Sequence, residues 1–226
     1  MSASFFEQEC TPEVKLLFNS PISMPPFAAR LCKGMESFDS LLFDKDEILN
    51  EDVELLEKRI LSGDIMNPSH ESVMEHLFYT FYINGISRAV LQQLSRHRME
   101  SLSVLSTRYA LKRILRTLSE HPTREELGRF LVFTGNDKVD EASCQALLAV
   151  ISMAKTGVKN DVLKYCIPES FKLRLLITVN ARSLRNFFVL RTHRKAMWEM
   201  RRLAFAIYDE IPDEHKFIFD DRMHEK

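Results

Sequence analysis

Two stretches of the chain carry the hydrophobic pattern of β-strands. Residues 77–86 (LFYTFYINGI) form a nearly continuous apolar run, rich in aromatic residues and ending close to a glycine. Such a run predicts a strand that is buried on both faces in the middle of a sheet. Residues 173–179 alternate between apolar and more polar positions. This period of two predicts a second strand with one buried face.

Each predicted strand is followed by a residue that favours the start of a helix. Ser87 follows the first strand, and Asn180 follows the second. Serine and asparagine are good N-cap residues because their side-chain oxygens accept hydrogen bonds from the first free N–H groups of a helix. We therefore expect one helix from Ser87 through Leu94 and another from Asn180 through Phe188.

Further helices are indicated by apolar residues at three- and four-residue steps. This spacing occurs over residues 44–62 and again over 195–211. Thr123 and Glu126 have the spacing of a capping box, which would open a short helix. They fall within the polar stretch 117–143, which we expect to be a peripheral excursion from the main body.

The order of these elements favours one fold class. Strands and helices are mixed without regular alternation, and the chain has no repeat, low-complexity tract or Pro/Gly-rich linker. We therefore expect a single α+β domain over residues 1–226, with a central, mostly antiparallel sheet flanked by helices. Because the sequence contains no Gly-x-Gly-x-x-Gly motif, a Rossmann fold is not expected.

The composition is that of an ordinary enzyme-sized domain. Charged residues make up 28% of the chain and hydrophobic residues 45%, and the formal net charge is -1. This balance argues against a protein whose main task is to coat nucleic acid. The cysteines form no CxxC pair, and no apolar window is long enough for a membrane helix. We expect a cytoplasmic protein without a disulfide framework.

The densest cluster of chemistry-bearing residues is RHRMESLSVLSTR, residues 96–108. On a helix, Gln93, Arg96 and His97 would share one face. Guanidinium groups match phosphate oxygens in geometry, and nearby hydroxyls supply further hydrogen bonds. The cluster therefore indicates a phosphorylated ligand. The alternative is a solvated basic helix end that binds nothing.

The same string resembles the signature of the flavin-dependent thymidylate synthases, which is Arg-His-Arg, seven residues, then Ser. Here it reads Arg96-His97-Arg98, seven residues, then Ser106. Three further blocks agree with the family in the same order, and together they cover roughly two-thirds of the chain. They are His70, Ser72, Glu75 and His76 upstream, then Asn180-Ala181-Arg182-Ser183-Leu184 with Asn186-Phe187 and Leu190-Arg191, then Trp198-Glu199.

The resemblance implies two sets of binding residues. Residues that would meet dUMP are Gln93, Leu94, Ser95, Arg96, Val104, Leu105, Ser106, Thr107, Arg108, Lys164 and Arg191. Residues that would meet FAD are Ser72, Arg96, His97, Arg98, Val104, Asn180, Ala181, Arg182 and Asn186. The resemblance also implies that residues 104–108 form a loop around the nucleotide phosphate.

The resemblance also implies a catalytic residue and a reaction. Arg191 would place its fixed positive charge against the uracil ring, favour ionisation at N3 and make C5 a better nucleophile. NADPH would reduce FAD, methylenetetrahydrofolate would supply one carbon, and a hydride from FAD would complete the methyl group of dTMP. The family further implies a homotetramer with its sites between subunits. Ser106 is expected to bind phosphate rather than to act as a nucleophile, because no His–Asp pair is placed to activate it.

Three positions depart from the family pattern. Lys164 stands where many members have an arginine, so the bidentate phosphate contact is lost although the charge remains. Lys195 replaces a histidine near the flavin, and Val104 replaces a glutamate in the signature loop. We expect these changes to tune the site without removing it.

Two other classes of function have partial support. A metal site could draw on His70, Glu71, Glu75 and His76, but the spacing of the histidines does not suit zinc and no cysteine joins them. No metal is expected. A nucleic-acid module could use a run of basic residues, and the balanced charge speaks against it. That run is Arg96, Arg98, Arg108, Lys112, Arg113 and Arg116. The sequence leaves open whether His70 takes part in chemistry or shapes the pocket.

Overall fold

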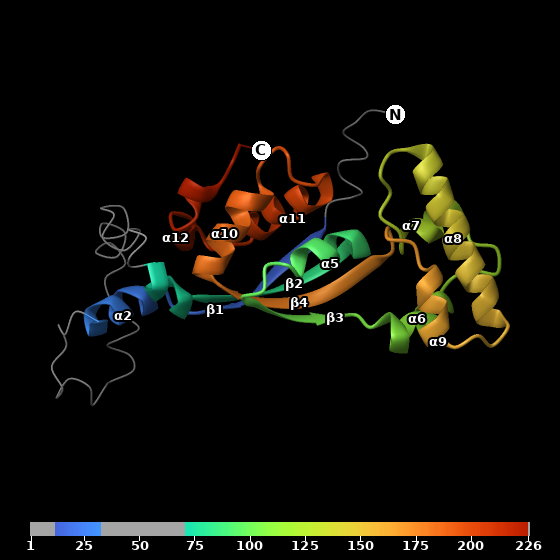
Figure 1. Ribbon diagram of the computed structural model, residues 1–226, viewed down its shortest axis with the longest axis horizontal. Coiled ribbons are helices and arrows are strands. Elements are labelled where there is room, and N and C mark those ends of the chain that lie inside the picture. Colours follow the sequence, from blue (N-terminus) through green and yellow to red (C-terminus); the bar gives the residue numbers. More distant parts are fainter. Residues whose placement is uncertain (1–11, 33–70, 226) are drawn as a thin grey trace.

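A four-stranded antiparallel sheet forms the centre of the molecule. The computed structural model describes residues 12–32 and 71–225. The strands lie in the order β1-β2-β4-β3, and each pairs antiparallel with its neighbour (Figure 1). Their bounds are β1 Glu13–Asn19, β2 Phe78–Ser87, β3 Glu100–Val104 and β4 Lys172–Asn180. The predicted α+β class with an antiparallel sheet is confirmed.

The strand β2 lies mid-sheet, between β1 and β4, as its sequence predicts. The prediction that both of its faces are buried is wrong. Tyr79, Phe81 and Ile83 are fully buried on one face, whereas Phe78 on the other face is 41% exposed. Leu176 of β4 is 38% exposed on that second face. The apolar residues on the second face of β2 therefore belong to a surface that the core of a single chain does not cover.

Three helices cover the buried face of the sheet. They are α5 (Arg88–Leu94), α10 (Ala181–Arg191) and α11 (Trp198–Asp209). Both predicted caps are confirmed: the Ser87 hydroxyl accepts from the N–H of Val90 at 3.2 Å, and Asn180 Oδ1 accepts from the N–H of Ser183 at 2.8 Å. The strands β2 and β4 thus continue directly into α5 and α10, and both helices pack back over the sheet.

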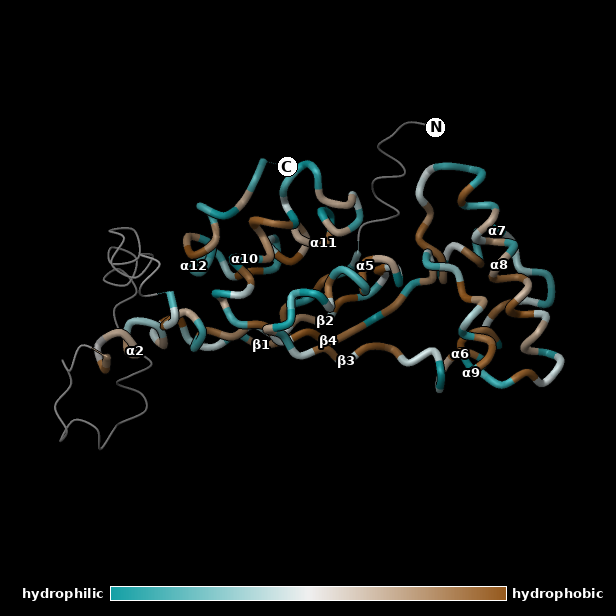
Figure 2. The backbone as a smooth tube through the Cα atoms, in the orientation of Figure 1, coloured by the Kyte–Doolittle hydropathy of each residue, from teal (hydrophilic) through white to brown (hydrophobic). Residues whose placement is uncertain are grey.

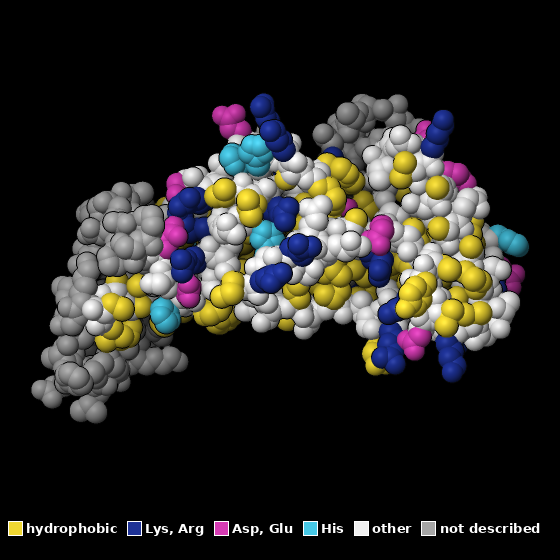
Figure 3. Space-filling model, viewed as in Figure 1, with side chains coloured by type: hydrophobic (Ala, Val, Ile, Leu, Met, Phe, Trp, Pro, Cys, Tyr) yellow, Lys and Arg dark blue, Asp and Glu magenta, His cyan; other side chains and the backbone are white. Residues whose placement is uncertain are grey.

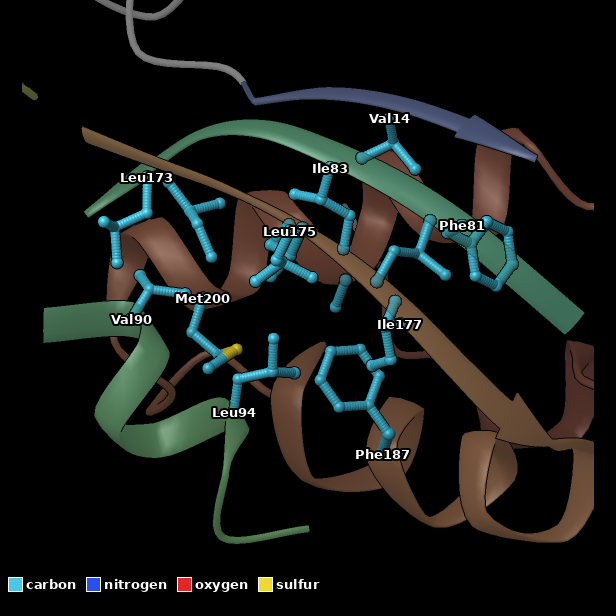
Figure 4. Close-up of a cluster of buried hydrophobic side chains, with 14 of the residues drawn as sticks. Val14, Phe81, Ile83, Val90, Leu94, Leu173, Leu175, Ile177, Phe187 and Met200 are labelled. Atoms are coloured by element: carbon cyan, nitrogen blue, oxygen red, sulfur yellow. The ribbon is translucent and has the colours of Figure 1, made fainter. Parts of the chain in front are cut away.

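The core lies between this sheet face and the helices. Val90 and Leu94 of α5, Phe187 of α10 and Met200 of α11 point toward Ile177 and its neighbours on the sheet (Figure 4). Complete burial of each such side chain contributes about 1.5–3 kcal/mol relative to exposure. In Figure 2, β4 is coloured mostly as hydrophobic, whereas the turn between α5 and β3 is coloured mostly as hydrophilic.

Five further helices lie at the two ends of the sheet among the described residues, and α12 lies beside α10 (Figure 1). The helices α6, α7, α8 and α9 form a group at one end, and α2 lies at the other (Figure 1). The bounds of these and of the C-terminal helix are α2 Met24–Cys32, α6 Thr107–Leu115, α7 Arg124–Gly128, α8 Asp137–Lys155, α9 Asn160–Leu163 and α12 Asp213–Lys216. In the described part of the chain, short 3-10 helices span Glu71–His76, Lys164–Cys166 and Asp220–Arg222.

The polar stretch 117–143 contains α7 and the start of α8. The capping box that opens α7 is confirmed, since Thr123 and Glu126 each bond the other's backbone N–H. Buried Leu127 and Leu131 join this region to the hydrophobic core. Among the residues with a described structure, no helix is long and apolar enough to cross a membrane.

The helix predicted over 195–211 begins later than expected, at Trp198. The reason is local hydrogen bonding, because His193 Nδ1 accepts from the N–H of Lys195 at 3.1 Å and its carbonyl accepts from Ala196 at 2.9 Å. These bonds form a turn that keeps Lys195 in the loop before α11. The helix predicted over 44–62 lies outside the described residues.

A buried carboxylate connects α11 to the start of α5. Glu199 accepts hydrogen bonds from the Ser87 backbone N–H at 2.7 Å and from the Ser87 hydroxyl at 2.6 Å. Burial raises the pKa of Glu199, while these two bonds to Ser87 lower it. The glutamate of the Trp-Glu block therefore holds the point where β2 turns into α5.

Candidate active site

The centre of the candidate site is a hydrogen-bonded group of Gln93, His97 and Arg191. Arg191, the last residue of α10, donates from Nε to His97 Nε2 at 2.9 Å and from Nη1 to Gln93 Oε1 at 3.1 Å. Gln93 lies on α5, and His97 follows it in the turn before β3. The guanidinium is therefore fixed at two points by residues of the signature region.

The turn after α5 keeps Gln93 and His97 on one side. The helix α5 ends at Leu94, so Arg96 and His97 lie beyond it. The sequence-based prediction places both on one helical face with Gln93. Three backbone hydrogen bonds continue the helical path: the N–H groups of Ser95, Arg96 and His97 donate to the carbonyls of Leu91, Gln93 and Leu94 at 3.0, 3.3 and 3.0 Å. Arg98 then takes a positive φ of 55° and leaves this path. Gln93 and His97 consequently meet Arg191 together, while Arg98 is exposed.

His97 is a neutral, half-buried imidazole. Its ring lies edge-on to Phe187, with 5.0 Å between ring centroids. Burial, reinforced by the positive charge of Arg191, lowers the pKa of His97 to about 4. Because Nε2 accepts from Arg191, the single proton of the neutral ring is placed on Nδ1. Burial also lowers the pKa of Arg191, which remains a cation at neutral pH.

Arg191 faces an open hollow of about 560 Å³. The hollow is lined by Ala89, Gln92, Gln93, Arg96, Glu169, Arg191 and Met197. Lysine and arginine side chains gather in the middle of this face of the molecule, where α5 ends, beside a histidine (Figure 3). Two guanidinium groups and two amides around one hollow suit a planar ligand that carries carbonyl oxygens and negative charge.

Four residues of the hollow are not among the site residues predicted from the sequence: Ala89 and Gln92 on α5, and Glu169 and Met197 elsewhere in the chain. The Met197 sulfur accepts from Gln93 Nε2 at 3.3 Å, and Glu169 Oε2 accepts from Gln92 Nε2 at 2.9 Å. Both come from loops far along the chain from α5. Their residue types carry no motif, so only the folded structure brings them to the site.

The second half of the signature forms the junction between β3 and α6. Val104 ends β3 and Thr107 begins α6, so the expected loop over 104–108 is wrong: only Leu105 and Ser106 lie between the two elements. The Leu105 N–H donates to the Arg174 carbonyl at 2.9 Å and keeps the chain beside β4. This register extends the strand into the predicted loop.

Ser106 occupies the N-cap of α6, yet its hydroxyl makes no capping hydrogen bond. It is exposed, whereas Thr107 is only 7% exposed. The start of a helix offers free backbone N–H groups and positive potential, which suit a phosphate. A free hydroxyl at this point adds one more hydrogen-bond donor.

Two exposed cations lie near this helix start. Arg108 Nε pairs with Asp161 at 2.8 Å, and the Asn160 amide donates to the Arg108 carbonyl at 2.9 Å. Lys164 follows in the 3-10 helix Lys164–Cys166, which packs near α6. Ser106, Arg108 and Lys164 therefore form one group on the end of the molecule that carries α6 and α9.

The group around Ser106 and the hollow around Arg191 are separate in one chain. None of Ser106, Arg108 and Lys164 lines the hollow. The five residues of β3 lie between them along the chain. At about 3.3 Å per residue, a strand of that length spans on the order of 15 Å. A single chain thus presents the two halves of the predicted nucleotide site apart from each other.

The expected flavin residues gather around the start of α10 and the 3-10 helix Glu71–His76. Ser72, Arg182 and Asn186 are exposed, whereas Asn180 and Ala181 are buried. Arg182 Nη1 donates to Glu75 Oε1 at 2.6 Å. Exposed hydroxyl, amide and guanidinium donors, together with Arg98, fit a dinucleotide with a diphosphate. The sidechain oxygen of Asn180 is already used to cap α10.

The carboxylates considered for a metal site are paired with arginines. Glu71 Oε1 lies 3.2 Å from Arg222 and 3.7 Å from Arg185, and Glu75 pairs with Arg182. Over residues 12–32 and 71–225, no group of three or more metal-binding side chains was found. His70 lies outside the described residues.

Comparison with known proteins identifies the family. The model of the family described as "Thymidylate synthase complementing protein" matches residues 19–215. A protein of Campylobacter jejuni (strain RM1221), named flavin-dependent thymidylate synthase, is 43% identical over 215 residues, which are 94% of this chain and 98% of that protein. The chain belongs to the flavin-dependent thymidylate synthases.

Other members of the family are similar in sequence and in structure. The flavin-dependent thymidylate synthase of Helicobacter pylori (strain 26695) is 46% identical over 157 residues, 67% of this chain and 76% of that protein. A crystal structure of the H. pylori enzyme with FAD and dUMP has a TM-score of 0.79 and 38% identity, and covers 95% of this chain and 100% of the other. The fold of this flavin-dependent thymidylate synthase is therefore that of the family.

Proposed function

We propose that this chain converts dUMP to dTMP, with 5,10-methylenetetrahydrofolate as the one-carbon donor and NADPH as the source of electrons. FAD, when bound, supplies the hydride that completes the methyl group, and tetrahydrofolate is released. The observation that carries this function is the fixed Arg191 guanidinium beside a basic hollow. It occurs in a chain that is 43% identical to a named member of the family.

Arg191 is the catalytic residue in this proposal. Its guanidinium is held by His97 and Gln93, so its charge does not need to reorganise when the substrate becomes anionic. A fixed cation at the uracil ring favours loss of the N3 proton. The resulting anion has more electron density at C5, which then forms the new carbon–carbon bond.

The pyrimidine half of dUMP is proposed to occupy the hollow lined by Gln93, Arg96 and Arg191. The exposed Ser95, between Gln93 and Arg96 along the chain, is proposed as a further contact. Leu94 would contribute only its backbone, because its side chain is fully buried in the core. The exposed Arg96 has a guanidinium that can form paired hydrogen bonds to an anion.

The phosphate of dUMP is proposed to bind at the start of α6. The donors there are the Ser106 hydroxyl, the N–H of Thr107, the Arg108 guanidinium and the Lys164 ammonium. Val104 and Leu105 would line this position at the end of β3. Lys164 supplies charge without the bidentate geometry of an arginine, so it would contribute less directional binding.

FAD is proposed to bind along the start of α10 and the signature turn. Ser72, Arg182 and Asn186 offer exposed side-chain donors, Asn180 and Ala181 lie at the helix start, and Arg98 projects from the turn. Arg96, His97 and Val104 complete the proposed contact set. Lys195 adds a cation in the loop before α11, where many relatives have a histidine.

A homotetramer with sites between its subunits is part of the proposal. The two halves of the nucleotide site lie apart in one chain, so a second copy is needed to bring a Ser106 group to an Arg191 hollow. The partly exposed apolar surface that includes Phe78 and Leu176 provides a face on which copies could pack. We also propose that the enzyme works in the cytoplasm, with small molecules rather than nucleic acid as its partners.

An omission assay tests the proposed reaction. The purified protein is supplied with FAD, NADPH, methylenetetrahydrofolate and dUMP under low oxygen, and dTMP is measured by chromatography. We expect dTMP only in the complete mixture and none when FAD, NADPH or the folate is left out. Formation of dTMP without NADPH or FAD would contradict the proposed electron path.

A further inference from the structure

A small, partly open cavity lies beside His97, on the inner face of the sheet. Its volume is about 10 Å³, roughly the space of one water molecule. Most of its wall is apolar and includes Phe81, Leu94 and Ile177. The polar side chains on its wall are His97, Glu100 and Ser183. A glutamate in such a cavity is unusual, because burial of a charge costs free energy unless it is paired.

Glu100 reaches the cavity because of its position in β3. It is the first residue of that strand and pairs with Val179 of β4. Both side chains point to the face of the sheet that the helices cover, so Glu100 is drawn into the core side. Its Oε1 is buried and has no hydrogen-bond partner among the described residues.

His97 also lines this cavity. Its Nε2 accepts from Arg191, so its proton is on Nδ1. Within residues 71–225, no acceptor is found for Nδ1. The wall of the cavity thus holds a buried acceptor without a donor, Glu100 Oε1, and a histidine whose remaining donor has no acceptor. An unpaired buried group costs about 1–3 kcal/mol, and a bond from Nδ1 would remove this cost at Glu100.

We propose that Glu100 is a positioning residue for Arg191: its carboxylate accepts the Nδ1 hydrogen of His97, directly or through one water, and thereby holds the ring that anchors Arg191. The three side chains then form a chain of carboxylate, imidazole and guanidinium that ends at the hollow. A carboxylate bonded to Nδ1 also makes Nε2 a better acceptor. This inference rests on the proposed function, because Arg191 acts on the substrate there.

The link depends on the ionisation of Glu100. Burial raises the pKa of Glu100 to about 7. The residues of β2, β4, α10 and α11 that line the cavity have no titratable side chain. The titratable group on the wall besides Glu100 is His97, which bonds Arg191 through its Nε2. Above that pH the carboxylate holds the ring; below it the proton on Glu100 weakens the hold.

Nuclear magnetic resonance of histidine tests the link without relying on turnover. The holoenzyme is labelled with ¹⁵N in its histidines, and His97→Gln protein assigns the His97 signals. We expect the His97 Nδ1 signal to shift as the pH passes through about 7. In Glu100→Gln this shift should disappear, because the amide keeps an acceptor oxygen and cannot ionise. A His97 signal that titrates identically in both proteins would overturn the proposal.

Kinetics supply a second readout. Glu100→Gln should stay active and lose the acid limb of kcat/KM for dUMP, whereas Glu100→Leu should lower kcat about tenfold, the cost of one misplaced hydrogen bond. Both variants should keep the flavin spectrum, and Ser101→Ala, on the opposite face of β3, serves as the control. Wild-type kcat and pH profile in Glu100→Leu would also overturn the proposal. If the wild-type protein makes no dTMP, the proposed function fails, while the histidine spectra still decide the Glu100–His97 link.

Discussion

Arg191 donates a hydrogen bond of 2.9 Å from Nε to His97 Nε2. This bond joins the end of α10 to the turn that carries the Arg-His-Arg signature. The guanidinium could not be held in this way by a protonated histidine, because an imidazolium has no lone pair to accept. The low pKa of His97 keeps its ring neutral, and only the neutral ring can hold Arg191 in this position.

Removal of the Arg191 guanidinium should abolish dTMP formation and spare the flavin. We expect Arg191→Ala to bind FAD nearly as well as the wild type, since Arg191 is not in the proposed flavin contact set and the flavin residues Asn180, Ala181 and Arg182 lie at the other end of α10. Arg191→Lys keeps the charge but loses the paired contacts to His97 and Gln93, so its kcat should also fall steeply. FAD titration and a dTMP assay separate these effects.

The matched control for these variants is Arg194→Ala, because Arg194 is an exposed arginine in the following loop that does not line the hollow. It should keep both FAD binding and turnover. Near-normal dTMP formation by Arg191→Ala would rule out a role for this charge at the uracil ring.

Loss of the Ser106 hydroxyl should weaken dUMP binding and leave part of the turnover. Its hydroxyl is a free donor at the helix start, and loss of one hydrogen bond to a charged phosphate costs about 1.5–3 kcal/mol. Ser106→Ala should therefore raise the KM for dUMP by roughly tenfold to a hundredfold. Isothermal titration with dUMP measures the binding. Normal dUMP binding with no chemistry at all would instead indicate that Ser106 acts as a nucleophile.

A buried arginine on α10 should stabilise the fold. Arg185, with a side chain that is 3% exposed, bonds both carboxylate oxygens of Asp221, at 2.7 and 2.9 Å, and the Ile218 carbonyl. Substitution of this arginine removes the partner of the Ile218 carbonyl and one of the two partners of Asp221, which also pairs with Arg222 at 3.1 Å. Arg185→Met should therefore lower the free energy of unfolding by about 1–3 kcal/mol. Urea denaturation measures this change. Lys15→Met, at an exposed pair with Glu13 whose side chains are 63% and 52% exposed, should cost less than about 1 kcal/mol.

The stability of the protein should fall in mild acid because of His97. Folding lowers the pKa of this residue from 6.5 to about 4, so the unfolded chain binds its proton more readily. The contribution is fully present above pH 6.5 and is lost as the pH falls toward 4. The full shift would correspond to about 3.4 kcal/mol, and because solvent screens this partly exposed ring, we expect on the order of 1–2 kcal/mol.

Thermal unfolding followed at several pH values checks this contribution. His97→Gln, which has no group that titrates in this range, should be less sensitive to acid between these two limits than the wild type. An equal loss of Tm with pH in both proteins would assign the acid sensitivity to other groups.

Local signals in the sequence predicted local structure well. The N-caps Ser87 and Asn180 and the capping box at Thr123 depend on residues within one turn, and the structure contains all of them. The start of the last long helix was misplaced, because a turn formed by His193 ends the preceding segment. Such a turn depends on one side-chain hydrogen bond that periodicity does not reveal.

Features that depend on distant segments were not predictable. The apolar run of β2 does not tell whether its second face is covered by the same chain, and Phe78 remains 41% exposed there. The strand β3 reaches Val104, the first residue of the loop that the family resemblance implies, because β4 offers it a pairing edge. Met197 and Glu169 reach the hollow from loops without a motif.

The measurement that tests the account most directly is the visible absorption spectrum of the purified protein with FAD under anaerobic conditions. Spectra are recorded before NADPH, after NADPH, and after addition of dUMP with methylenetetrahydrofolate. We predict oxidised-flavin bands that bleach with NADPH and return only when both substrates are present, with dTMP formed in proportion. A protein that takes up no FAD, or whose bleached bands do not return with both substrates, would contradict the proposed function.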